Sequence, residues 1–159
     1  MTRAPVRLVV ATREWEDSLA ELFASLREAG DERFFHPHPL TREAAREVVA
    51  YRGSDAYYVL VRDGEVLGYG MLRGWDAGYT VPSLGMALDP SVRGQGLGRP
   101  FMELLHDAAR ARGARRIRLK VYPENEAARR LYERLGYVFS AVDDGQLVGS
   151  FHIDGGGSS

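Results

Sequence analysis

The chain has 159 residues, the size of one domain, and its 45% apolar and 27% charged residues are typical of a globular protein. Its formal net charge of −1 gives no indication of binding to nucleic acids or to anionic membranes. Cysteine is absent, which excludes disulfides, thiolate metal sites and an acyl-cysteine intermediate. The sequence has no apolar run of the roughly 18 residues needed to span a membrane, and no signal-peptide pattern at its start. We therefore expect a cytoplasmic protein.

The first part of the chain predicts a strand and two helices. Residues 6–11 are a short apolar strand, and Thr12 is placed to cap a helix that ends at Gly30. Thr41 caps a second helix that ends near Gly53. Apolar residues at helical spacing mark the buried faces of these helices, namely Trp15, Leu19, Leu22, Phe23 and Leu26 in the first and Ala44, Ala45, Val48 and Val49 in the second.

The segment between these helices, residues 34–40, contains two prolines and is expected to be a stiff loop. Its aromatic and imidazole side chains suggest one wall of a binding site, with Phe35, His36 and His38 as candidate substrate-binding residues. The structural alternative is that both imidazoles hydrogen-bond to the loop backbone while Phe34 and Phe35 pack inward. The two histidines are separated by one proline, which makes a poor chelate, so we expect no metal site.

Three strands are predicted next. Residues 56–61 and 65–72 flank an Asp-Gly pair, which is typical of a two-residue hairpin turn. Gly68 and Gly70 weaken the second of these strands and are candidates for a bulge. Residues 84–88 form a third, buried strand, which ends at an Asp-Pro pair.

A glycine-rich loop joins this third strand to a helix. The loop consists of Arg93, Gly94, Gln95, Gly96, Leu97 and Gly98, and Arg99 follows it. Glycines allow an anion to approach the backbone, and a helix N-terminus attracts negative charge. Arg93 and Arg99 can both pair with phosphate oxygens. The helix carries Leu97, Phe101, Leu104, Leu105, Ala108 and Ala109 on one face and is expected to end at Gly113.

Two familiar nucleotide-binding loops do not fit this segment. A Walker-type loop needs a Gly-Lys pair, which the sequence lacks, so a nucleotide switch is disfavoured. A dinucleotide-binding loop needs a third glycine where this chain has Arg99. The structural alternative is a turn that only connects the strand to the helix.

A second motif follows the glycine-rich loop. Residues 116–121 alternate charged and apolar side chains, as in a strand, and Asn125 is a good cap for the next helix. That helix carries Ala128, Leu131, Tyr132 and Leu135 at helical spacing before Gly136. Residues 138–142 and 146–153 predict a final hairpin, and residues 155–159 a flexible tail. We expect one domain over residues 1–154.

The pattern Arg-x-x-Gly-x-Gly followed by Asn-x-x-Ala-x-x-Leu-Tyr-x-x-Leu-Gly-Tyr resembles the cofactor motifs of the GNAT superfamily of N-acetyltransferases. The resemblance implies an α/β (α+β) single-domain GNAT fold, with a mixed, mostly antiparallel sheet of about seven strands and four helices. It implies acetyl-CoA as co-substrate, with the pyrophosphate bound by residues 93–99. It places the pantetheine arm between splayed strands, against Met86, Ala87, Leu88 and Asn125. It also assigns Tyr132 as the general acid for the departing thiolate.

The resemblance further implies acetyl transfer to the primary amine of a small molecule, by direct attack in a ternary complex. The expected partner is that amine, and we expect no nucleic acid or membrane as a partner. The expected assembly is a monomer or a homodimer. The general base is not evident, because the strand before the loop carries only Ser83 and Asp89. Two alternatives remain open, a non-catalytic acyl-CoA-binding sensor domain and an enzyme that acetylates a protein amine. The presence of both Asn125 and Tyr132 favours an enzyme.

Overall fold

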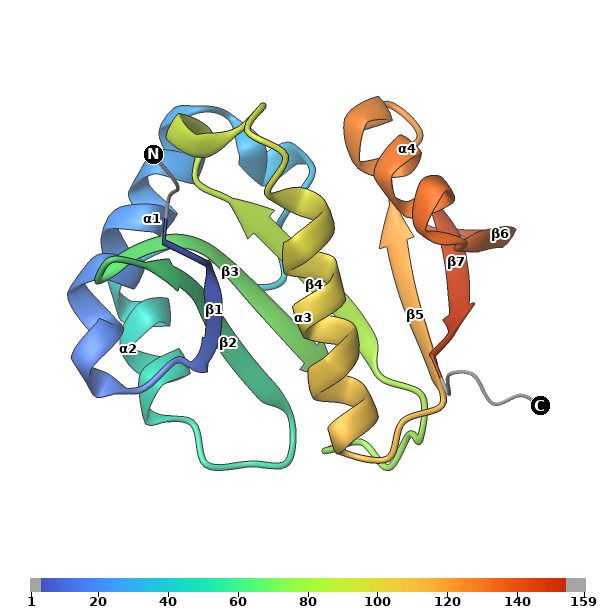
Figure 1. Cartoon of the computed structure of the whole chain (residues 1–159), viewed down its shortest axis with the longest axis horizontal. Coiled ribbons are helices and arrows are strands. Elements are labelled where there is room, and N and C mark those ends of the chain that lie inside the picture. The colour runs from blue at the N-terminus through green and yellow to red at the C-terminus, as the bar shows by residue number, and fades with distance from the viewer. Residues whose placement is uncertain (1–3, 154–159) are drawn as a thin grey trace.

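The computed structural model describes residues 4–153 and contains one seven-stranded sheet with four α-helices (Figure 1). The strands are β1 (Arg7–Val10), β2 (Ala56–Arg62), β3 (Glu65–Arg73), β4 (Ser83–Leu88), β5 (Arg116–Val121), β6 (Val138–Asp143) and β7 (Gln146–His152). The helices are α1 (Glu16–Glu28), α2 (Arg42–Ala50), α3 (Gly98–Ala111) and α4 (Glu126–Leu135), with short 3-10 helices η1 (Arg13–Trp15), η2 (Asp31–Arg33) and η3 (Pro90–Val92). This architecture confirms the predicted fold class. The predicted flexible tail lies outside the described residues.

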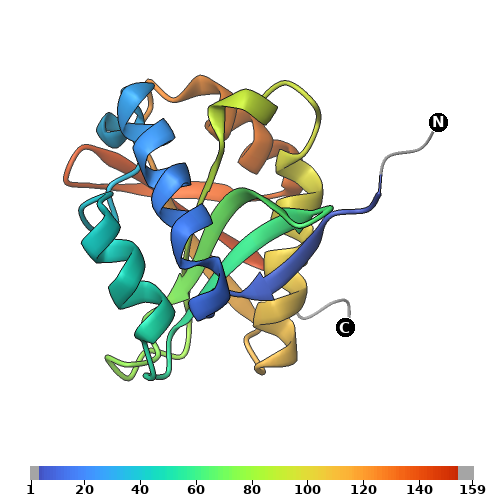
Figure 2. The same cartoon turned by 90° about the vertical axis from the view of Figure 1, so that its left-hand side faces the viewer.

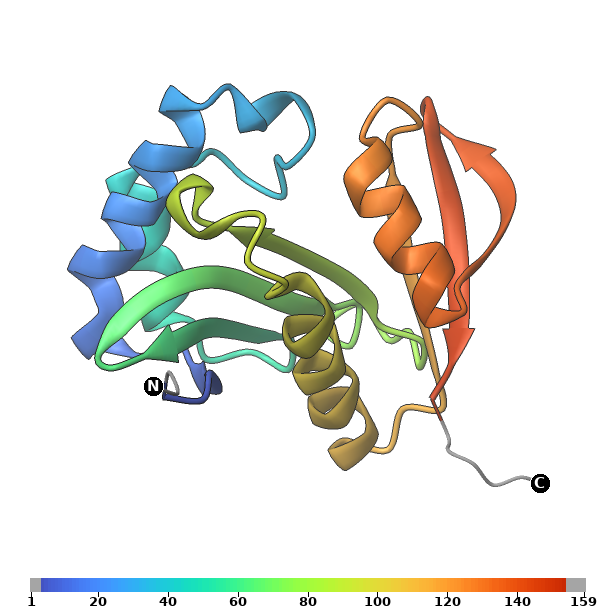
Figure 3. The ribbon, with the colours of Figure 1, turned by 45° about the horizontal axis from the view of Figure 1, so that its top comes forward.

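The sheet has the order β1-β2-β3-β4-β5-β7-β6 and is antiparallel except between β4 and β5. These two parallel strands share a single register pair, Ser83 with Arg118, and a 3.0 Å hydrogen bond from the Arg118 N–H to the Pro82 carbonyl. Beyond this point the strands diverge toward their carboxyl ends (Figure 1). The loop of residues 31–40 and helix α4 lie on opposite sides of the opening (Figure 3). The splayed strands expected from the resemblance are therefore present.

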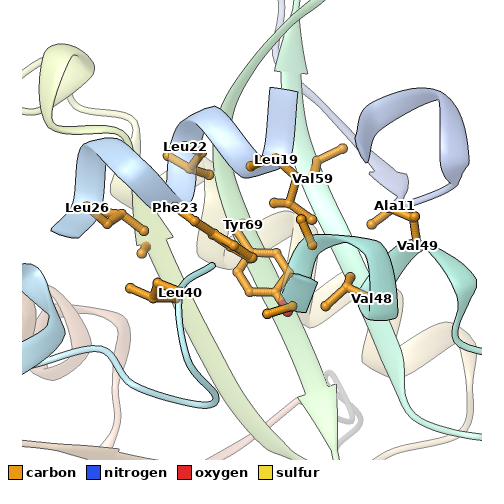
Figure 4. Close-up of a cluster of buried hydrophobic side chains, with 14 of the residues drawn as sticks. Ala11, Leu19, Leu22, Phe23, Leu26, Leu40, Val48, Val49, Val59 and Tyr69 are labelled. Carbon is orange, nitrogen blue, oxygen red and sulfur yellow. The ribbon is translucent and has the colours of Figure 1, made fainter. Parts of the chain in front are cut away.

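The helices form a layer on each face of the sheet (Figure 2). Helices α1 and α2 cover one face, where Tyr69 of β3 is fully buried against Phe23 of α1, with ring centroids 5.1 Å apart (Figure 4). Helix α3 covers the other face through Phe101 and Leu105, both fully buried. The two clusters make up the core and hold β3 and β4 in fixed positions. The buried faces predicted for α1 and α2 agree with this packing, except that Trp15 lies in η1 and is only half-buried.

Glycine stands at two positions of β3 for different structural reasons. The pairing with β2 shifts register beside Gly68, so Leu67 is an extra residue and the predicted bulge is confirmed there. A Cβ on Gly70 would lie 3.1 Å from carbons of Phe101 and Leu105. Glycine at this position therefore lets α3 pack closely on the sheet.

Of the two predicted threonine caps, one needs correction. Thr12 makes no side-chain capping bond, because the 3-10 turn η1 precedes α1 and separates Thr12 from it. Thr41 caps α2 as predicted, and its Oγ1 accepts a 3.1 Å hydrogen bond from the Ala44 N–H. On α3 the buried stripe is wider than predicted and includes Met102 and His106. His106 is buried because Phe151 of β7 stacks on its ring, with centroids 4.9 Å apart.

Candidate active site

A cleft of about 470 Å³ occupies the opening between β4 and β5. Its walls come from β4, the glycine-rich loop, the end of β5 and helix α4. Among the predicted site residues, those lining it are Met86, Ala87, Leu88, Arg93, Gly94, Gly96, Leu97, Gly98, Asn125 and Tyr132. Phe35 lines it from the opposite side. The fold thus brings the two sequence motifs together around one cavity.

The backbone of β4 presents hydrogen-bonding groups to this cleft. Asp89, which directly follows β4, donates its N–H to the carbonyl of Leu67 in β3 at 2.8 Å. Successive residues of an antiparallel strand direct their backbone groups to opposite sides. The backbone of Ala87 therefore pairs with β3, whereas the N–H groups of Met86 and Leu88 point toward β5, which has already diverged. An extended amide-containing ligand could pair with this open edge as an added strand would.

The glycine-rich loop shows why three of its residues are glycine. Gly94 and Gly96 have φ values of 77° and 76°, in the left-handed region, and an added Cβ on either would meet no atom within 4 Å. Glycine at these two positions therefore allows the left-handed backbone conformation, and both positions border open space. A Cβ on Gly98 would lie 2.9 Å from Leu131 of α4, so Gly98 allows α3 and α4 to approach each other. The loop places several N–H groups and the N-terminus of α3 beside the cleft, a favourable site for a phosphate.

The charged residues of the loop have partners within the chain. Two nitrogens of Arg93 lie 2.7 and 3.3 Å from the carboxylate oxygens of Asp31, and its Nη2 also donates to the Leu88 carbonyl at 2.9 Å. A phosphate at this position would compete with Asp31 for the guanidinium. Arg99 pairs with Glu103 at 3.3 Å, and neither Arg99 nor Gln95 is among the residues that line the cleft.

Helix α4 contributes two side chains that the sequence singled out. Asn125 occupies the N-cap position but makes no side-chain capping bond, so its amide is not committed to the helix it begins. Tyr132 is 7% exposed and lines the cleft. Burial disfavours its phenolate and raises its pKa to about 12. The hydroxyl is therefore protonated at neutral pH and can donate a hydrogen bond into the cleft.

The loop of residues 34–40 divides into a structural and an exposed part. His38 is held on both sides, since its Nδ1 donates to the Pro39 carbonyl at 2.7 Å and its Nε2 accepts from the Tyr69 hydroxyl at 2.8 Å. Burial lowers the pKa of His38 below the ordinary value. His36 instead hydrogen-bonds to the hydroxyl of Tyr122, at 2.8 Å, near the surface. Phe35 packs against the α1–α2 core and has its edge toward Tyr69.

A second, smaller cavity of about 190 Å³ lies on the other side of this loop. It shares the side chains of Phe34, Phe35 and Leu84, and the backbone of Gly85, with the larger cleft. His36 lines it and His38 does not. Phe35 and His36 thus line the cavity, while the packing of Phe35 against the core and the contacts of His38 match the structural alternative.

Several lining residues were not predicted from the sequence. In the larger cleft these include Asp31, Lys120 and Leu131, and in the smaller cavity Arg73, Ser83 and Gln146. The second cavity joins β3, β4 and β7, so no local spacing marks its members. Ser83 was considered only as a possible base. Among residues 4–153, no three His, Cys, Asp or Glu side chains are grouped in a way that could hold a metal ion.

None of the helices within residues 4–153 combines the length and apolar character required to cross a membrane.

Comparisons with known proteins agree with this geometry. The sequence model of the Acetyltransferase (GNAT) family matches residues 15–137. Mycothiol acetyltransferase of Corynebacterium glutamicum (strain R) is 31% identical over 142 residues, which cover 86% of this chain and 44% of that protein. Streptothricin acetyltransferase of Streptomyces lavendulae is 30% identical over 99 residues, covering 61% of this chain and 51% of that protein. The chain thus spans about half, or less, of the length of these curated relatives.

The fold is also similar to a solved structure of RimL, described as a ribosomal L7/L12 alpha-N-protein acetyltransferase in complex with coenzyme A. The TM-score is 0.80, with 97% of this chain and 96% of that chain covered. Sequence identity is 19%, so this likeness concerns the fold alone.

Proposed function

The chain belongs to the acetyltransferase (GNAT) family, and from that premise we propose that it transfers an acetyl group from acetyl-CoA to the primary amine of a small molecule. The observation that carries this proposal is the meeting of two cavities along the wall formed by Phe35, Leu84 and Gly85. The larger cleft has the loop, the helix N-terminus and the open strand edge that a pyrophosphate and an amide-containing arm require. The smaller cavity would hold the amine.

The proposed placement of acetyl-CoA follows from the order of these features. The pyrophosphate binds at Gly94 and Gly96, where the backbone is open to an anion. From there the pantetheine arm runs back along β4 and meets the open N–H of Leu88 first and the open groups of Met86 next. The amide of Asn125 faces the same arm from α4. The thioester then lies near the wall shared with the second cavity.

Three groups of the chain would act in the reaction, in which the amine attacks the thioester carbonyl directly. The Met86 N–H donates a hydrogen bond to the carbonyl oxygen and stabilises the negative charge that develops there. Tyr132, which is protonated at neutral pH, gives its proton to the departing thiolate. His36, the imidazole in the second cavity, takes the proton that the amine loses.

The second cavity has a volume of about 190 Å³, which is enough for the amine end of a compact acceptor. The position of Tyr132 in the larger cleft supports catalysis over simple sensing, since a sensor needs no proton donor beside the thioester.

The test is a screen of primary amines with acetyl-CoA, following release of free thiol and the mass of the acetylated product. We expect a subset of compact amines to be acetylated. Binding of CoA, seen as a rise in melting temperature, without turnover of any amine would instead support a sensor domain. Acetylation of protein N-termini alone would shift the acceptor class to proteins.

A further inference from the structure

Arg73 brings a positive charge to the second cavity without a carboxylate partner. It is the last residue of β3 and lines the cavity beside Met71. Its guanidinium donates one hydrogen bond, from Nη1 to the Pro37 carbonyl at 3.3 Å. None of the ion pairs formed within residues 4–153 includes Arg73. Because a guanidinium has five N–H donors in a planar fork, most of its donors remain available to a ligand.

The remaining polar groups of the cavity fit the same chemistry. Ser83 offers a hydroxyl and Gln146 an amide, and both can donate hydrogen bonds. Of the described residues that line the cavity, none is an aspartate or a glutamate. An acid group on the acceptor would therefore be complemented in charge, whereas a second ammonium group would meet only repulsion.

The position of Arg73 also fits an acceptor that reaches the thioester. Arg73 lies opposite Ser83 in the β3–β4 ladder. Gly85, two residues along β4, belongs to the wall shared with the larger cleft. Two strand residues span about 7 Å. An acid group bound at Arg73 would thus leave an amine a few bonds away at the shared wall.

We propose that the acceptor is a compact amine that carries an acid group, foremost a carboxylate, and that Arg73 binds this group in a bidentate manner. The inference rests on the proposed acetyl transfer and specifies its substrate class. Arg73 here is a specificity-determining residue, since planar guanidinium groups match the geometry of carboxylates.

The first experiment compares matched acceptors with acetyl-CoA. The probes are free L-amino acids, the corresponding carboxamides, and 1-aminoalkylphosphonates of the same side chains. We expect the kcat/KM of the free acids to exceed that of the carboxamides by about ten- to a hundredfold, the scale of a hydrogen-bonded charge. The phosphonates distinguish a site for carboxylates from one for acid groups in general.

Arg73 is then tested by substitution. In Arg73→Gln we expect the preference for acids over carboxamides to disappear through a raised KM for the acids, with unchanged kinetics for the carboxamides. Arg73→Lys keeps the charge and should retain part of the preference. Arg62→Gln, at the end of β2 and outside both cavities, is the matched control and should behave like the wild type.

The outcomes separate the two proposals. Equal turnover of acids and carboxamides by the wild type would overturn the role of Arg73 while leaving acetyl transfer intact. An equal loss with both acceptor classes in Arg73→Gln would mean that Arg73 only holds the Pro37 carbonyl, and would also overturn it. Acetylation of no amine, with or without an acid group, would refute the proposed function, and this inference with it.

Discussion

The Nε2 of His36 lies 2.8 Å from the hydroxyl of Tyr122, although 86 residues separate the two in the sequence. The ring of Phe34 lies beside the same tyrosine, with centroids 6.1 Å apart. Tyr122 directly follows β5, and His36 belongs to the loop that borders β4 at the shared wall. This contact therefore joins the two sides of the sheet opening and fixes one wall of the smaller cavity.

We predict that the two loop histidines respond differently to alanine. His38→Ala should lower the melting temperature, because it leaves the buried Tyr69 hydroxyl without its acceptor, at a cost of about 1–3 kcal/mol. The surviving enzyme should have normal kinetics. His36→Ala should leave the melting temperature nearly unchanged but lower kcat or raise the acceptor KM. The check is thermal denaturation beside steady-state kinetics, with CoA affinity as the control for both. Equal effects of the two substitutions would contradict the division of the loop.

Gly96→Asp should abolish CoA binding while the fold persists. Gly96 has φ 76° and an added side chain would enter open space, so a carboxylate there would repel the pyrophosphate. Gly96→Asn is the matched control, because Asn has nearly the same shape and also tolerates the left-handed region, but is neutral. Titration calorimetry with CoA measures both variants. If the two variants bind CoA with similar affinities, the pyrophosphate does not bind at this loop.

Tyr132→Phe should lower kcat by about ten- to a thousandfold with little change in CoA affinity, since general-acid assistance is typically of this order or somewhat larger. The side chain packs beside Tyr137, with ring centroids 5.8 Å apart, and phenylalanine preserves this packing. Unaltered turnover in the variant would mean that Tyr132 is only a core residue.

The pH dependence gives a separate test of Tyr132. With a pKa raised to about 12 by burial, Tyr132 should stay protonated through pH 10, where an ordinary tyrosine is about half ionised. We therefore expect kcat of the wild type to show no alkaline decline between pH 8 and 10. A decline that the Tyr132→Phe variant lacks would indicate an unperturbed phenol and contradict the buried position.

His106 should make stability dependent on pH. It is buried, lies 2.7 Å from the Tyr137 hydroxyl, and has a pKa lowered to about 4 by burial and by the nearby Arg110. The unfolded chain, with a histidine pKa of about 6.5, binds more protons between pH 6.5 and 4. The free energy of unfolding should therefore fall as the pH falls through this window, by up to roughly 3 kcal/mol.

His106→Gln provides the comparison, because glutamine can still hydrogen-bond to Tyr137 but does not titrate. Urea denaturation at pH 7 and pH 4.5 should show a smaller loss of stability in the variant than in the wild type. His38 also has a lowered pKa but is present in both proteins, so it cancels in the difference. If the free energy of unfolding falls equally with pH in the variant and in the wild type, His106 is not the cause of the loss of stability.

The sequence alone was sufficient for the features that depend on neighbouring residues. The glycine-rich loop, the start of α4 at Asn125 and the position of Tyr132 follow from short spacings, because a strand, a turn and a helix each impose a local period. The order of these elements also led to the fold class. The local rules failed at Thr12, where a 3-10 turn intervenes, and at His106, which is buried by contacts from β7.

Only the tertiary structure decided which side chains meet. Asp31 and Arg93 pair at the edge of the cleft although 62 residues separate them, and Arg73 lines a cavity built from three strands and a loop. The same loop contains one histidine committed to Tyr69 and another exposed at the cavity, although both are imidazoles beside prolines. These differences depend on where β3, β4 and β5 bring distant segments together, and the one-residue pairing of β4 with β5 sets that arrangement. The period of a single element contains no information about its neighbours across the sheet, so the two cavities form only when the chain is folded.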